Sequence, residues 1–97
     1  MKRPEPTPGF AIRINDDTQL GLAIVVAEDE EGQQYHPVAV ASTINEAREL
    51  AASDLRGRMR ELERGGDPGI CPYEYKVWAQ GVGGEYLVAA RILATSL

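Results

Sequence analysis

The stretch TINEARELAASDLRGRMRELERGG, residues 43–66, is the part of the sequence that decides the fold. Thr43 and Glu46 have the spacing of a capping box, in which each side chain accepts a backbone N–H group at the start of a helix. Two glycines, Gly65 and Gly66, follow at the position where a left-handed residue commonly ends a helix. The sequence therefore predicts one long helix that stops just before Gly65.

This helix has a single apolar stripe, whose members recur at intervals of three and four residues, the period of one helix face. The members are Ile44, Ala47, Ala51, Leu55, Met59 and Leu62. A single stripe requires a single surface to cover it. The strand-like segments on either side of the helix are the only candidates for that surface.

Alternating apolar residues predict strands both before and after the helix. The five segments are residues 10–14, 20–27, 35–41, 73–79 and 86–92. The side chains expected to face the core are, on the second segment, Leu20, Leu22, Ile24 and Val26, and, on the last segment, Tyr86, Val88, Ala90 and Ile92. Pro37 has no N–H group for the ladder, which favours an edge position for the third segment.

The short links between these segments favour antiparallel pairing. The expected fold class is α+β, in the order β-β-β-α-β-β, with one long helix packed on an antiparallel five-stranded sheet in two layers. Residues 1–9 carry three prolines and are expected to form a flexible arm. Residues 10–97 are expected to form a single α+β domain.

Composition and charge exclude several classes of protein. With a net charge of −5, the chain lacks the excess of basic residues that is typical of a domain that binds nucleic acid, so a nucleic-acid partner is disfavoured. No apolar run approaches the roughly 20 residues that span a bilayer, and the opening MKRPEPTPGF is unlike a secretory signal. A single cysteine, Cys71, forms no internal disulfide and fits a reducing compartment. We therefore expect a soluble cytoplasmic protein.

The sequence contains no motif that indicates catalysis. It has no nucleophile elbow and no phosphate-binding loop, and Gly81–Gly84 joins two strands without opening a helix. The two acidic clusters lack calcium-binding spacing. We therefore expect that the protein is not an enzyme and that it has no cofactor and no metal site. A thiol-dependent enzyme that uses Cys71 with His36 is an alternative, because an imidazole beside a thiol could activate it.

Trp78 is the most informative residue for function. On its strand it alternates with Tyr75 and Val77, so it should share the face of Lys76 on the side of the sheet away from the helix. The candidate interface residues on this open face are Trp78, Leu87, Ala89, Lys76 and Val25. Its cross-strand neighbour is expected to be Leu87 or Ala89. A tryptophan on a half-apolar open face indicates a surface for association.

These observations favour a small non-enzymatic protein-interaction module that forms a homodimer through the open sheet face. A second interpretation comes from the strands that precede a helix beginning Thr43-x-x-Glu46-Ala47, an outline that resembles the HicB-like antitoxin fold. The chain departs from that family because the short Pro/Gly-Cys segment before the helix is missing. The resemblance implies an antitoxin-like regulator that binds a small partner protein.

Overall fold

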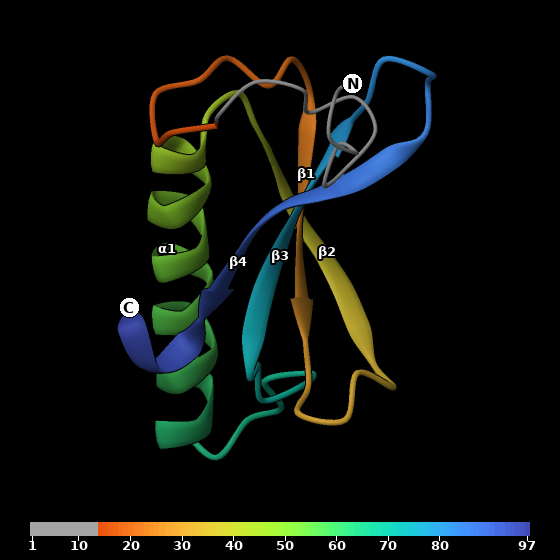
Figure 1. Ribbon diagram of the computed structural model, residues 1–97. Coiled ribbons are helices and arrows are strands. Elements are labelled where there is room, and N and C mark those ends of the chain that lie inside the picture. The colour runs from red at the N-terminus through yellow and green to blue at the C-terminus, as the bar shows by residue number, and fades with distance from the viewer. Residues whose placement is uncertain (1–13) are drawn as a thin grey trace.

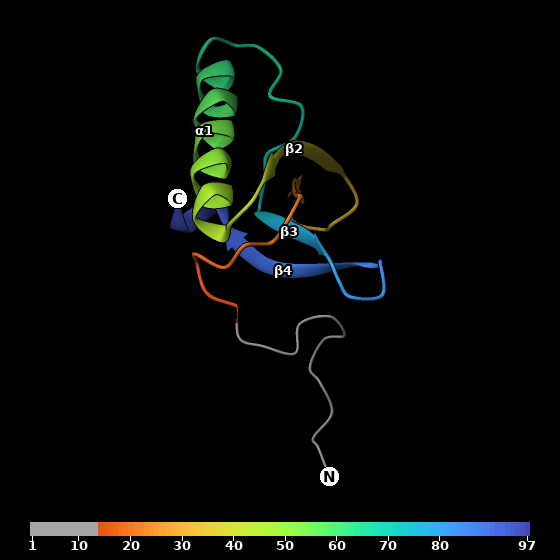
Figure 2. The same cartoon turned by 90° about the horizontal axis from the view of Figure 1, so that it is seen from above.

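The structure, a computed structural model, describes residues 14–97. The elements are β1 (Ala23–Glu28), β2 (Tyr35–Ala41), α1 (Ile44–Glu63), β3 (Glu74–Gln80), β4 (Tyr86–Leu93) and a 3-10 helix, η1 (Ala94–Ser96). The four strands form one antiparallel sheet in the order β2-β1-β3-β4, and α1 lies against one face of it (Figures 1 and 2). This two-layer α+β arrangement confirms the expected class. The strand expected at residues 10–14 lies outside the described residues, except for Ile14, which is not in a strand.

Both ends of α1 follow the sequence prediction. The Thr43 hydroxyl accepts the backbone N–H of Glu46 at 3.0 Å. The Glu46 carboxylate turns back to the backbone N–H and the hydroxyl of Ser42, and this backbone hydrogen bond, more than the one from the hydroxyl, lowers the pKa of Glu46. At the other end Gly65 has φ +80°, and the N–H groups of Gly65 and Gly66 donate to the carbonyls of the last turn, which closes a Schellman motif.

The core lies between α1 and the sheet, and its contact is made largely by small residues. Ala47 and Ala51 of α1 are fully buried, as are Ala23 and Ala27 of β1. Alanine on both sides allows the helix axis to approach the sheet closely, while Tyr75 of β3 fills the remaining volume.

The expected facing of β1 is wrong. Ala23, Val25 and Ala27 point toward α1 and are fully buried, whereas Leu22, expected in the core and lying just before β1, is 75% exposed. Val26 is buried as expected, but it pairs with Lys76 and so lies on the face away from α1. Because β1 is a central strand with apolar residues on both faces, its alternation alone could not decide which set faces the helix. The alanines of α1 need small partners, and the odd-numbered residues of β1 supply them.

Two β-bulges also change the facing of the edge strands. The register of β3 against β4 shifts between Val77, which pairs with Ala90, and Trp78, which pairs with Val88, so that Ala89 is the extra residue. Ala90 and Ile92 therefore face the helix as expected, but Val88 lies on the other face. β2 is the edge strand that Pro37 predicts, with an equivalent shift that leaves Val38 unpaired.

A polar network anchors the second half of α1 to the sheet and to the following loop. The Asp54 carboxylate accepts from the Tyr75 hydroxyl at 2.8 Å and from Arg58 Nε at 2.7 Å. Arg58 Nη1 donates to the carbonyl of Pro68 at 2.6 Å. Burial, and then the hydrogen bond to Asp54, raise the pKa of Tyr75, so its hydroxyl keeps the proton that it donates. The Asp54 carboxylate thus joins the helix to β3, and Arg58, which it holds, joins the helix to the connector.

Candidate interaction surface

The face of the sheet opposite α1, called here the outer face, is covered by no other helix or strand of residues 14–97 (Figure 2). The register assigns its residues. Ile24 of β1 lies between Val40 of β2 and Trp78 of β3, and Trp78 in turn lies beside Val88 of β4. None of these four side chains belongs to the core cluster on the helix side. Together they form a continuous band across all four strands, the apolar half of the outer face.

This band is partly exposed to solvent. Val40 is 56% exposed at the edge of the sheet, and Ile24, Trp78 and Val88 are partly exposed. Each position alternates with a residue that faces α1, so the strands themselves fix the outward direction of the band. Trp78, for example, lies between the buried Val77 and Ala79. The monomer therefore presents an aromatic side chain and three β-branched side chains on one surface.

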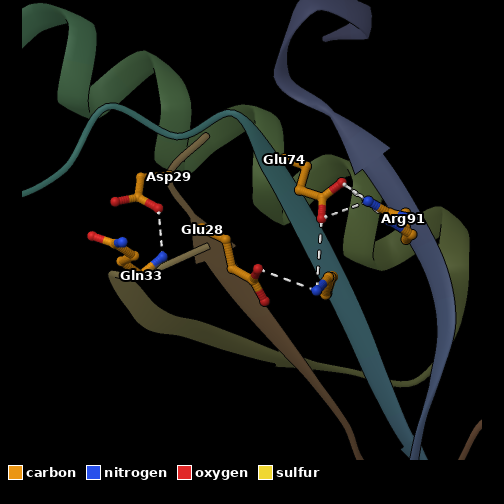
Figure 3. A network of polar contacts seen from close by, with 6 residues as sticks. Glu28, Asp29, Gln33, Glu74 and Arg91 are labelled. Atoms are coloured by element: carbon orange, nitrogen blue, oxygen red, sulfur yellow. Dashed lines mark hydrogen bonds and ion pairs between the residues drawn. The ribbon is translucent and has the colours of Figure 1, made fainter. Parts of the chain in front are cut away.

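The other end of the outer face is a cluster of ion pairs, the charged half, made by Glu28, Glu74, Lys76 and Arg91. Arg91 approaches the two carboxylate oxygens of Glu74 at 2.9 and 3.1 Å (Figure 3). Lys76 Nζ lies 3.2 Å from Glu28 and 3.8 Å from Glu74. Glu74 is almost fully buried, and these partners satisfy its charge. With two carboxylates and two cations, the charged half carries no net charge.

The acidic loop that follows β1 is built as a hydrogen-bonded turn. The Asp29 carboxylate accepts the backbone N–H of Gln33 at 2.9 Å (Figure 3), and Gly32 takes a positive φ of 70°. Glu30 and Glu31 are exposed at its tip and form no ion pair in the described part of the chain.

The residues proposed from the sequence for the interface fall on both faces. Trp78 and Lys76 lie on the outer face as expected. Val25 is fully buried in the core, Leu87 pairs with the buried Ala79, and Ala89 packs against the helix-side core. The face assigned to these three residues is wrong. For Val25 the cause is that both faces of β1 are apolar, and for Leu87 and Ala89 the cause is the bulge in β4. Ile24, Val40 and Val88 take their places.

Cys71 and His36, the pair considered for thiol chemistry, lie in the connector before β3 and on β2. Cys71 is exposed, and within residues 14–97 its thiol makes no hydrogen bond to His36. The His36 ring and the Arg58 guanidinium both lie beside Gly69, since a Cβ atom on Gly69 would be 3.0 Å from His36 Cε1 and 3.2 Å from Arg58 Nη1. In the same residues no three side chains of His, Cys, Asp or Glu gather closely enough to hold a metal ion.

Comparisons with protein-family models, with curated proteins and with solved structures give no significant match. The described residues contain no helix of the length and apolar character needed to cross a membrane.

Proposed function

We propose that this protein is a cytoplasmic, non-enzymatic protein-interaction module that forms a homodimer through the outer face of its sheet. The observation that carries the proposal is the apolar half, an open band of Ile24, Val40, Trp78 and Val88. Burying such a band releases apolar surface from water, which is the main driving force of association. Aromatic side chains near the centre of an interface contribute most of the binding energy.

Charge supports a second copy of this chain as the partner. The chain carries a net charge of −5, so two copies repel each other over most of their surfaces. The charged half is an exception, because its two carboxylates and two cations cancel. Two-fold symmetry places the same patch of both subunits in contact, and a neutral, apolar patch meets its own copy without repulsion.

A single substitution in the apolar half tests this proposal. Val40→Glu places a carboxylate on the exposed edge of the band and should leave the protein monomeric at concentrations where the wild type has the mass of two 10.6 kDa chains. Leu62→Glu is the matched control, since Leu62 is 45% exposed but lies on α1, and this variant should dimerise like the wild type. The mass is measured by sedimentation equilibrium. Equal dimerisation of both variants would show that the outer face is not the interface.

A further inference from the structure

The apolar stripe of α1 extends beyond the part that the sheet covers. Its first members are buried, Leu55 is half-buried, but Met59 is 51% exposed and Leu62 is also exposed. The end of the chain lies beside this part of the helix (Figure 1), and between them is a cavity of about 470 Å³. We call it the α1 groove. Its main lining residues are Leu55, Arg56, Met59, Arg60, Glu63 and Leu97.

Two arginines distinguish this groove from the rest of the surface. Residues 14–97 contain seven lysines and arginines, and five of them lie within 4 Å of a carboxylate. The two that pair with no carboxylate in that part of the chain are Arg56 and Arg60, and both line the α1 groove. In a chain with excess acid, the two cations that pair with no carboxylate of residues 14–97 lie at the edge of one apolar cavity.

We propose that the α1 groove binds an amphipathic helix of a partner protein that carries carboxylates one turn apart beside its apolar face. The proposal rests on the protein being an interaction module, but not on the outer face or on dimerisation. Arginine pairs with carboxylates through charge-assisted hydrogen bonds, which supplies the complementarity. The flexible Met59 side chain suits a surface that packs against another helix.

The spacing of the two arginines in the α1 groove matches the spacing of residues one turn apart on a partner helix. Arg56 and Arg60 are separated by about 6 Å along the axis of α1, which is also the separation of residues i and i+4 on a partner helix. The exposed apolar surface continues past the cavity to Leu62, about two turns from Leu55. An apolar face with residues at i, i+3 or i+4 and i+7 covers that length. A small carboxylic acid would fill the cavity but would leave Leu62 in water, so a helix is the better occupant.

Two designed peptides of about five turns test the proposal with the full-length protein. Both have the same leucine face, and they differ in carrying either two glutamates or two lysines at i and i+4 beside it. Fluorescence anisotropy should show that the wild type binds the glutamate peptide about tenfold more tightly, with an affinity that falls as salt rises. Arg56→Glu/Arg60→Glu should reverse the preference. Arg48→Glu/Arg64→Glu, with the same change in net charge but outside the groove, should keep it.

Three results would overturn this inference. The wild type could bind both peptides equally, or neither at about millimolar concentration. Decanoate could bind in an Arg56-dependent and Arg60-dependent manner while neither peptide does, which would make the groove a site for small carboxylates. Arg56→Glu/Arg60→Glu could change the mass of the protein without peptide, which would assign the groove to a second copy. The Val40→Glu variant should bind the glutamate peptide normally, so failure of the dimer proposal and failure of this one are distinguishable.

Discussion

Asp54→Ala should lower the free energy of unfolding by about 2–3 kcal/mol, the largest loss of stability that we expect from a single polar substitution in this protein. The carboxylate accepts hydrogen bonds from both the Tyr75 hydroxyl and Arg58 Nε. Removing it leaves a phenol in the core and a guanidinium on the helix without their main partner. The side chains of Asp54 and Arg58 are 20% and 14% exposed, so water compensates in part and the loss stays below that of a fully buried ion pair.

Urea denaturation measures this loss, with Tyr75→Phe as the matched control. Phenylalanine keeps the ring and leaves the Asp54–Arg58 pair intact, so it should cost about 1 kcal/mol, the value of one hydrogen bond. If Asp54→Ala cost no more than Tyr75→Phe, the carboxylate would not be joining the helix to the connector. The Arg58 contact with the Pro68 carbonyl would then be sufficient to hold the end of α1.

Trp78→Ala should raise the dissociation constant of the dimer by about 30-fold, because a buried aromatic side chain at the centre of an interface contributes about 2 kcal/mol or more. The stability of the monomer should fall by less, since Trp78 is only partly buried and lies outside the helix-side core. Sedimentation equilibrium gives the first quantity and urea denaturation of dilute protein the second. Trp78→Phe should retain most of the dimer.

The opposite order of effects would change the assignment of this residue. If Trp78→Ala lowered the stability of the monomer by more than it weakened the dimer, Trp78 would belong to the fold of the single chain. The apolar half would then act as a second core layer, and the outer face would lose its central anchor.

The helix and the presence of the four described strands could be predicted from the sequence because their signals are local, whereas the order of those strands within the sheet could not. A capping box, a terminal Gly-Gly pair and a regular stripe fix the two ends of α1 within a few residues. The facing of β1 could not be predicted, since apolar residues occupy both of its faces and the choice depends on the alanines of α1. The exposure of Met59 could not be predicted either, because the apolar stripe of α1 does not show where the sheet stops covering the helix.

The candidate interface could be predicted only in part, for related reasons. Alternation with Val77 placed Trp78 and Lys76 on the outer face. The bulge that pairs Trp78 with Val88 inserts one residue, Ala89, into β4. No sequence signal marks this insertion. The alternation of β4 therefore predicts the wrong face for each residue between the start of the strand and the bulge. The contact between Glu74 and Arg91 joins positions 17 residues apart and depends on that same register.

The fluorescence of Trp78, the single tryptophan of the chain, tests the central claim most directly. Association through the band that contains it should move the indole out of water as protein concentration rises. The emission maximum is therefore expected to shift to shorter wavelength on concentration and to return on dilution. An emission maximum that stayed constant from dilute to millimolar protein would show that no second copy covers this side of the sheet.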